Sequence, residues 1–481
     1  MNPFATATAI VAACRRGETT AAEMVAMYCE RREQLRDRVN GIVTPDYGRA
    51  LEAAKRLDED RAGKSGALHG VPMTIKDGIH VAGLPSTGGM IEPAKAIAAE
   101  DAPNVRRLRD AGAVILGKTN VPVANADWQA VNPLFGRTSN PWNASLTSGG
   151  STGGGAAAVA AGLSAAELGS DLGGSIRIPA AFCGLFGHKP SWSVMPRGGH
   201  FPWQNFPNPA RGLAVQGPLA RGAADLELLF DVLCGAEGLE EKGWRLTLPP
   251  ARFNRLAQCR VGVLLLPDWI PVEGAILDAQ QALCDTLAQR GAQVREFDAT
   301  PSFGDLSALY RHYLSLLQCL LAGSLPAATR AKAAAKMRGY QDPFLDAVAE
   351  GLEGSAGLLI ELVEMSERYK AAWERVFKDF DVLLSPACST NAFPHDDSYF
   401  YDRTLLVDGE RMPYYRLSAI PSLATLGGLP ATVFPSGRLA PTGAPIGLQV
   451  MGAYLEDRST LRFTQLVEAA IGGFTPPPGF D

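Results

Sequence analysis

Two serines in glycine-rich turns and one lysine in an apolar segment are the residues of this sequence best suited to chemistry. Ser151 lies in GGSTGGG, Ser175 lies in DLGGSIR, and Lys76 lies in GVPMTIKDGI. Glycine has no Cβ, so these turns can adopt positive φ and bring backbone N–H groups close to a ligand. A serine hydroxyl is a poor nucleophile unless a base lies beside it. The next question is therefore which residue could serve as that base.

Lys76 is the candidate base. The apolar residues around it, Val71, Met73 and Ile75, alternate as in a β-strand. Burial disfavours the charged ammonium and lowers the pKa of a lysine, which can then accept a proton. Taken alone, the segment fits better with a strand-end lysine that reaches water or pairs with Asp77. The two serines shift the balance toward a catalytic lysine.

The turn that carries Ser175 predicts an oxyanion hole. The successive backbone N–H groups of Leu172, Gly173 and Gly174 could bind an oxygen that becomes negative beside the Ser175 hydroxyl. The alternative is a turn with a chance serine, since Gly-Gly-Ser occurs in many loops. A second alternative treats the glycine run 149–155, before a helix at 156–161, as a phosphate cradle. The patterns of the P-loop and of the dinucleotide-binding turn are missing, so acyl-transfer chemistry is favoured.

Histidine and cysteine offer no better catalytic group. The six histidines are dispersed without HxH or HExxH spacing, which argues against a zinc hydrolase, and no metal or other cofactor is expected. Cys183, beside Phe182, is typical of a buried small hydrophobic residue rather than of a nucleophile. The eight cysteines form no CxxC pair, which indicates reduced thiols and a cytoplasmic protein.

Composition narrows the class of partner. The chain has 481 residues, of which 46% are hydrophobic and 20% are charged, as in a globular protein with a sizeable core. A net charge of -5 predicts no binding to nucleic acid or to an anionic membrane. The apolar run at residues 9–14 is too short for a secretion signal or a membrane span. A small-molecule substrate is expected, and a homodimer is left open.

Helix-like and strand-like segments alternate along the chain, which predicts an α/β fold. We expect a single large domain over residues 1–481, with a mixed twisted β-sheet core and helices on both faces. Thr20 and Glu23 have the spacing of a capping box and predict a helix over 20–39. The segment from about 235 to 380 predicts a helical layer inserted in the same fold. The expected strands are 71–79, 113–117, 260–266, 382–385, 431–435 and 445–451, and the other expected helices are 47–62, 104–111, 155–163, 276–290, 306–321 and 358–377.

The sequence resembles the amidase signature family. The resemblance is carried by residues 149–190, from GGSTGGG to GHKP, and by GVPMTIKD at 70–77. GKTNVP, GPLAR, DVLLSPA and GAPIGLQVMG extend it over essentially the whole chain, with a signature core at about 65–220. The resemblance implies the amidase signature fold and a hydrolase of amide C–N bonds. It also implies that Ser175 is the nucleophile, that Ser151, 24 residues earlier, and Lys76 complete the triad, and that the Gly150–Ser151 peptide is cis.

The chain departs from the usual pattern of that family at four positions. Thr152 and Gly155 stand where the family commonly has serine, and His188 stands where leucine is common. The glutamine amidase subunit of tRNA-dependent complexes usually carries glutamine at the position of Ile178. None of the four belongs to the triad. The prediction is therefore a stand-alone amidase, and a glutamine amidase subunit is kept as the alternative.

Aromatic residues on two loops carry the prediction of substrate. One group follows the signature and includes Trp203, and the other includes Tyr414. Loops of this kind wall substrate pockets, although such clusters are as often internal packing. We expect hydrophobic or aryl amides, with esters or carbamates as side substrates. Arg403 and Arg416 lie in the second loop, and the sequence alone leaves open whether either of them points into the pocket.

Overall fold

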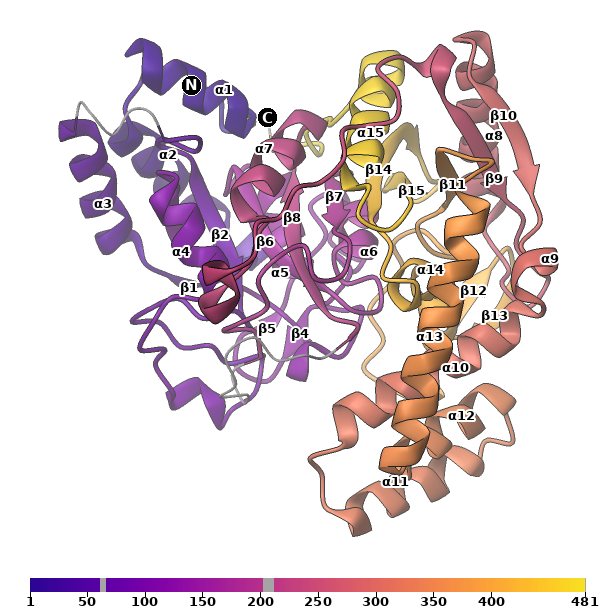
Figure 1. Cartoon of the computed structure of the whole chain (residues 1–481). Helices are drawn as coiled ribbons and strands as arrows, with labels where there is room; N and C mark the ends of the chain where they lie inside the picture. The colour runs from indigo at the N-terminus through magenta and orange to yellow at the C-terminus, as the bar shows by residue number, and fades with distance from the viewer. Residues whose placement is uncertain (61–65, 202–211, 481) are drawn as a thin grey trace.

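A mixed sheet of 11 strands forms the centre of the molecule (Figure 1). The computed structural model describes residues 1–60, 66–201 and 212–480. In sheet order, the strands are β1 (Ile42–Pro45), β3 (Val114–Thr119), β2 (Pro72–Lys76), β6 (Ala166–Asp171), β8 (Val215–Ala220), β7 (Phe186–Lys189), β14 (Ala431–Leu439), β15 (Pro445–Met451), β11 (Val382–Pro386), β9 (Arg260–Leu264) and β10 (Gln293–Phe297).

Parallel and antiparallel pairs alternate in blocks across this sheet. β3, β2 and β6 run parallel to one another, and so do β11, β9 and β10 near the other edge. The strands between these blocks, from β6 through β8, β7, β14 and β15 to β11, pair antiparallel, as does β1 with β3. The predicted α/β fold with a mixed sheet is confirmed.

Side chains that alternate along β2 separate the two faces of the sheet. Met73 and Ile75 point into the main hydrophobic cluster, whereas Thr74 and Lys76 point to the opposite face. The helices of the Met73 face are α1 (Ala7–Arg16), α2 (Ala21–Val39), α3 (Tyr47–Glu59), α4 (Pro103–Asp110), α7 (Ala223–Leu233), α8 (Gly274–Gln289) and α15 (Asp457–Ile471). Helices α5 (Gly153–Ala160) and α6 (Arg177–Cys183) pack on the Lys76 face.

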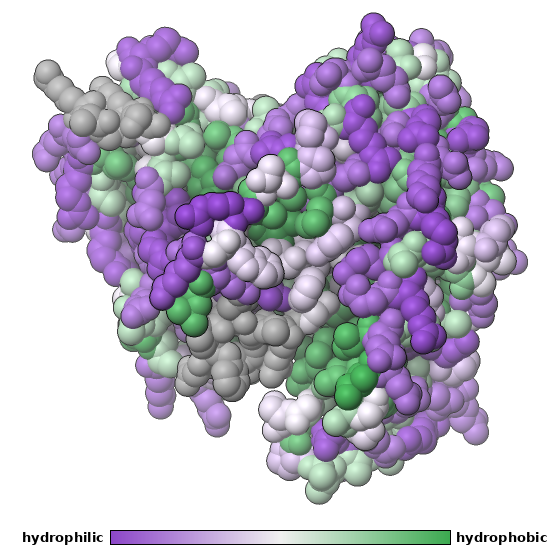
Figure 2. Space-filling view, viewed as in Figure 1, coloured by the Kyte–Doolittle hydropathy of each residue, from purple (hydrophilic) through white to green (hydrophobic). Residues whose placement is uncertain are grey.

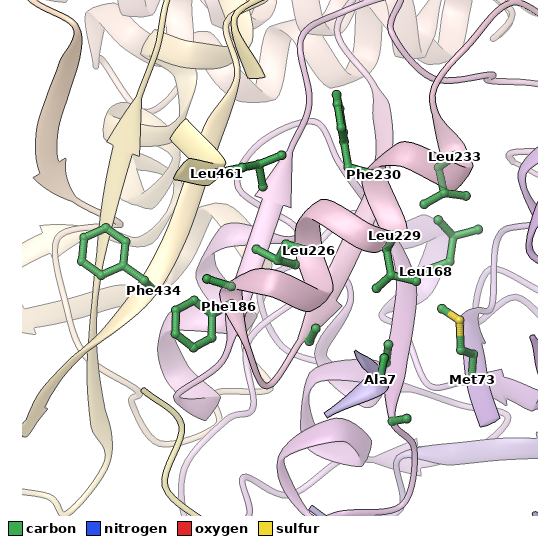
Figure 3. Packing of buried hydrophobic residues seen from close by; sticks show 14 of the residues in the cluster. Ala7, Met73, Leu168, Phe186, Leu226, Leu229, Phe230, Leu233, Phe434 and Leu461 are labelled. Carbon is green, nitrogen blue, oxygen red and sulfur yellow. The ribbon is translucent and has the colours of Figure 1, made fainter. Parts of the chain in front are cut away.

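Helix α7 illustrates how the Met73 face is covered. Leu226, Leu229, Phe230 and Leu233 lie along one side of α7, among strand residues that include Phe186 (Figure 3). They are spaced three and four residues apart, which is the spacing of one helix face. Burial of such apolar surface stabilises the fold by about 25 cal/mol per Å². The Met73 face therefore carries the main hydrophobic core, and the candidate functional side chain Lys76 points to the opposite face.

A helical lobe follows the parallel unit β9, α8 and β10. It consists of α9 (Thr300–Phe303), α10 (Leu306–Ala322), α11 (Ala327–Arg338), α12 (Pro343–Leu352) and α13 (Ala356–Val376), around a second hydrophobic cluster. Hydrophobic residues gather on the flank of this lobe that faces the rest of the molecule, and its outer side is hydrophilic (Figure 2). The region from 235 to 380 thus combines this lobe with two strands at the sheet edge.

Most elements predicted from apolar periodicity are present, with bounds shifted by a few residues. The helix after Thr20 has both hydrogen bonds of the capping box. β6, β7, β8 and α6 were not predicted; the buried strand β6 reads AELGSD, and its polar and glycine residues obscure a strand pattern. β10 was also missed because it is a partly exposed edge strand. The smaller elements include β4 (Val131–Asn132), β5 (Gly136–Arg137), β12 (Thr404–Val407), β13 (Glu410–Pro413) and α14 (Ala419–Leu426).

None of the described helices is both long and apolar enough to cross a membrane. None of the eight cysteines, all of which lie in the described ranges, forms a disulfide.

Candidate active site

Lys76 is the last residue of β2 and is fully buried. Its Nζ donates to Ser151 Oγ at 2.6 Å, to Ser170 Oγ at 2.9 Å and to the Ser170 carbonyl at 3.3 Å. Its position at the carboxyl end of β2 places the side chain between the Ser151 loop and Ser170, near the end of the neighbouring strand β6. The alternative of a strand-end lysine that reaches water is therefore wrong.

The environment of Lys76 lowers the pKa of its amine to near neutrality. Burial lowers the pKa of Lys76 to about 7, and the carboxylates of Asp171 and Glu167 only partly oppose this effect. Desolvation penalises the charged form of a buried lysine unless a close anion compensates it. The partners within hydrogen-bond distance are neutral hydroxyls and a carbonyl, so the group can accept a proton at physiological pH.

Ser151 lies in the loop just before α5. The Gly150–Ser151 peptide is cis, as the family resemblance implies. Glycine is needed at two positions of this loop, because Gly149 has a φ of 82° and a Cβ at Gly150 would collide with the backbone of Asp127. These glycines place the Ser151 hydroxyl against the lysine.

Ser175 lies in the turn between β6 and α6, and Asp171 holds that turn in place. The Asp171 carboxylate accepts the N–H groups of Gly174 and Ile176, each at 3.0 Å, and forms a buried ion pair with Arg177 at 2.9 Å. Burial raises the pKa of Asp171, but the Arg177 guanidinium and these hydrogen bonds outweigh it and bring the pKa to about 2. Asp171 therefore stays ionised and anchors the turn.

The three N–H groups predicted to bind an oxyanion have different surroundings. The N–H of Gly174 already donates to Asp171 Oδ1. Leu172 and Gly173 line the same cavity as Ser175. The carbonyl of Leu172 accepts from the Tyr313 hydroxyl at 3.3 Å, and the carbonyl of Gly173 accepts from the Trp128 indole N–H at 3.0 Å. These two contacts fix the orientation of the peptides next to the serine.

Ser151, Ser170 and Ser175 open into one cavity of about 390 Å³. The cavity lies between the serine loops and the helical lobe, since Tyr313, Leu317 and other residues of α10 form part of its wall. Its described aromatic lining residues are Trp128, Phe201, Tyr313, Tyr399, Phe400, Tyr401 and Tyr415. A cavity of this size and lining fits a small apolar molecule with a few polar contacts.

The described lining of the cavity contains one acid and no lysine or arginine. The acid is Asp127, whose two oxygens accept from Arg403 Nη1 and from the Tyr414 hydroxyl, each at 2.6 Å. Arg416 pairs with Asp342 at 3.1 Å. Both arginines considered from the sequence are thus committed to carboxylates and are not cavity lining residues.

Neither of the two residues predicted to bind substrate, Trp203 and Tyr414, is among the described residues that line the cavity. Trp203 lies outside the described residues. Tyr414 is 1% exposed and packs behind Trp128 and Phe400, so it supports the wall and does not line the cavity. The neighbouring Tyr415 does line it. Two adjacent tyrosines in a turn point in different directions, which the sequence did not reveal.

Sequence reasoning also missed several residues of the site. His200, one of the six dispersed histidines, lines the cavity, and burial together with Lys76 holds its pKa well below the usual value. Ser170 binds Lys76 with its hydroxyl and its carbonyl. Tyr313 comes from a helix distant in sequence. No local pattern marks these residues, because only chain folding brings them to the lysine.

The four departures from the family pattern lie outside the cavity lining. Thr152 donates to the Ser170 carbonyl at 3.3 Å, and His188 is buried between Thr432 and Asp457. Ile178 is fully buried in the hydrophobic cluster of α5 and α6. Ile178 therefore cannot contact a substrate in the cavity, and its identity says little about whether glutamine binds there. The lack of lysine and arginine in the described lining is the stronger argument against glutamine.

Other catalytic groups are not supported. Burial raises the pKa of the Cys183 thiol, which disfavours the thiolate. Within the residues that the structure describes, no group of three or more His, Cys, Asp or Glu could hold a metal ion.

Known proteins resemble this chain over nearly its full length. The family described as Amidase matches residues 23–461. An indoleacetamide hydrolase of Bradyrhizobium diazoefficiens is 31% identical over 455 residues, which cover 93% of this chain and 83% of that protein. A glutamyl-tRNA(Gln) amidotransferase subunit of an Exiguobacterium strain is 29% identical, and the match covers 96% of each chain. The crystal structure of a bacterial aryl acylamidase of the amidase signature family has the same fold, with a TM-score of 0.79 at 23% identity over 98% of this chain and 96% of that one.

The family match and the fold agree with the resemblance drawn from the signature segments. The match spans the lysine strand, both serine turns and the C-terminal strands. The chain therefore belongs to the amidase signature family and is a hydrolase of amide C–N bonds.

Proposed function

We propose that the protein hydrolyses amides through an acyl-enzyme on Ser175, with Ser151 and Lys76 as the proton relay. The observation that carries this proposal is the 2.6 Å contact between Lys76 Nζ and Ser151 Oγ at the wall of the cavity that Ser175 also lines. Nucleophile, relay and base then lie at one site, as activation of a serine requires.

The proposed reaction moves one proton in each direction. Neutral Lys76 takes a proton from Ser151, and Ser151 takes the proton of Ser175 as its Oγ bonds to the amide carbonyl carbon. The relay then returns the proton to the departing nitrogen as the C–N bond breaks. Water attacks the acyl-enzyme in the same way and releases the acid. Backbone N–H groups at Leu172, Gly173 and Gly174 are the proposed donors to the oxyanion, with the Gly174 hydrogen shared with Asp171.

The same mechanism predicts a pH profile with one rising limb. The protonated lysine cannot accept a proton, so kcat/KM is expected to rise as the pH passes through about 7 and to be highest in the alkaline range. The measurement is kcat/KM from pH 5.5 to 9.5 on an anilide for which chemistry limits the rate. A profile that is flat across this range would remove Lys76 as a titrating base.

We further propose hydrophobic or aryl amides as substrates, processed without a partner chain or tRNA. The aromatic lining supports this assignment, and so does the absence of lysine and arginine from the described lining. The α-carboxylate of glutamine would find no lysine or arginine in the described lining. Because a buried carboxylate without an ion-pair partner is costly, glutamine should bind less well than an uncharged amide. The similarity to the amidotransferase subunit keeps glutamine hydrolysis as the second candidate.

Steady-state kinetics of the purified chain distinguish the two candidates. We expect kcat/KM for an anilide to exceed that for glutamine by about 100-fold or more, because an unpaired buried charge costs about 3 kcal/mol or more. An aliphatic amide without charge is the control for size. A higher kcat/KM for glutamine would overturn the substrate assignment and would leave the catalytic residues as proposed.

A further inference from the structure

Glu167 is a buried carboxyl group that the proposed mechanism does not use. It lies in the middle of β6 and has no exposed surface. Its Oε1 accepts from the Thr119 hydroxyl at 2.6 Å, and its Oε2 is buried without a hydrogen-bond partner among the described residues. A carboxyl group in such a place is costly unless it has a function or a compensating neighbour.

The strand register places this carboxyl group next to Lys76. In the sheet, β2 lies between β6 and β3. Glu167 of β6 pairs with Thr74 of β2, and Thr119 of β3 pairs with Lys76 of β2. The hydrogen bond from Thr119 to Glu167 therefore crosses over β2 between residues 74 and 76. Because Thr74 and Lys76 point to the same face, the carboxyl group lies at the base of the lysine side chain.

A glycine on the neighbouring helix makes room for Glu167. A Cβ at Gly155 of α5 would collide with the Glu167 carboxyl group. A side chain at 155 would displace the carboxyl group, so glycine at this position leaves the space that Glu167 occupies.

Of the two carboxyl groups near Lys76, Glu167 is the one that changes its charge near neutral pH, whereas Asp171 stays ionised. Lys76 of β2 lies on the same face of the sheet as Glu167. Lys118 of β3 acts on Glu167 through its charge, but its side chain points to the other face, since it pairs in register with Ile75. Helix α5 presents only glycine, alanine and valine. Lys118 forms an ion pair with Asp77 at 3.3 Å. Asp171, the other carboxylate near Lys76, is bound to Arg177 and stays ionised. Burial raises the pKa of Glu167 to about 7, although Thr119 and the lysines oppose this effect.

We propose that Glu167 is a positioning residue that governs when Lys76 gives up its proton, by placing an ionisable carboxyl group over β2 beside the lysine. This inference rests on the proposed role of Lys76 as the base. An anion beside the lysine favours the ammonium form, so ionised Glu167 delays deprotonation as the pH rises. Two coupled groups of this kind titrate as a pair.

The test replaces Glu167 with the isosteric glutamine and follows Lys76 directly. The ¹³Cε resonance of Lys76 in protein labelled with ¹³C-lysine reports its protonation, and its loss in Lys76→Ala identifies it. We expect Glu167→Gln to move the titration midpoint of Lys76, and the rising limb of kcat/KM, about one pH unit lower. At a pH below the rising limbs of both proteins, kcat/KM as a fraction of its alkaline plateau should be up to about tenfold higher in the variant than in the unsubstituted enzyme.

Two further variants separate charge from structure. Glu167→Ala removes the same charge with a different shape, and it should give the same shift even if its melting temperature falls. Asp225→Asn removes a buried carboxylate that accepts from Ala7 and Thr8 on α1, and it should leave the Lys76 midpoint unchanged. An unchanged midpoint in folded Glu167→Gln, or an equal shift in Asp225→Asn, would overturn the inference. Undiminished activity in Lys76→Ala would refute the role of Lys76 as the base. The Lys76 resonance, compared between the unsubstituted enzyme and Glu167→Gln, would still test whether the two side chains titrate together.

Discussion

Replacement of Ser175 with alanine is expected to lower kcat/KM for every amide at least about 10⁴-fold, because the variant has no nucleophile with which to form the acyl-enzyme. The fold should be unaffected, since the turn is held by the Asp171 carboxylate through the N–H groups of Gly174 and Ile176 and not by the Ser175 side chain. Equal melting temperatures for the two proteins would check this. The rate loss can then be assigned to chemistry.

Covalent labelling provides the matching measurement. A fluorophosphonate probe followed by peptide mapping should modify Ser175 alone in the unsubstituted enzyme and no residue in Ser175→Ala. Ser418 is a suitable control for a cavity serine that is not activated. It lines the same cavity, and its hydroxyl is hydrogen-bonded to the Tyr310 hydroxyl rather than to a lysine. Ser418→Ala should be labelled at Ser175 as before. Stoichiometric labelling of another serine in Ser175→Ala would contradict the assignment.

Replacement of Lys76 with alanine is expected to reduce kcat about 10³- to 10⁵-fold, close to the loss from removal of the nucleophile, since members of a catalytic triad act as a unit. The physical reason is that Ser151 loses its proton acceptor when the 2.6 Å contact with Nζ is removed. The rising limb of the pH profile should disappear together with the rate. The measurement is kcat for an anilide between pH 6 and 9 in both proteins.

Lys189 offers a matched control for this experiment. It is equally buried, burial also lowers its pKa to about 7, and its Nζ donates to the Pro190 carbonyl at 2.8 Å. Lys189→Ala therefore removes a second buried lysine of similar properties that does not contact Ser151. We expect Lys189→Ala to lower the melting temperature but to leave kcat within about tenfold of the unsubstituted enzyme. Comparable rates for Lys76→Ala and the unsubstituted enzyme at neutral pH would exclude the lysine from the relay.

The electrostatic arrangement around Lys76 is compatible with its proposed role as a base. A carboxylate near a lysine raises the pKa of the amine, and Asp171 and Glu167 both act on Lys76 in this direction. The guanidinium of Arg177 forms a buried ion pair with Asp171 and so opposes part of that charge. Burial is the largest effect, and the pKa of the amine falls to about 7, so that both its neutral and its charged forms are present near pH 7. Arg177 thus anchors the turn and, in the proposed mechanism, limits the effect of Asp171 on Lys76.

The sequence by itself predicted the family and the amide-hydrolysing class of this protein, and some of the elements around the candidate site. Alternation around Lys76 predicted β2, and spacing predicted the capped helix after Thr20. The signature turns, with their glycines, predicted Ser151 and Ser175 as candidate catalytic residues. These features are local, because strand alternation, helix capping and glycine turns depend on residues that are neighbours in the chain.

The tertiary structure alone decided the composition of the cavity and the surroundings of the base. Tyr313 and Tyr415 come together from α10 and from a loop 102 residues later in the chain, and Tyr414 turns away to bind Asp127. β6 was hidden from periodicity because its interior positions carry glutamate and glycine for contacts across strands and with α5. Glu167 reaches Lys76 only through the register of three strands. Contacts between distant segments are set by packing and strand order, which no local pattern encodes.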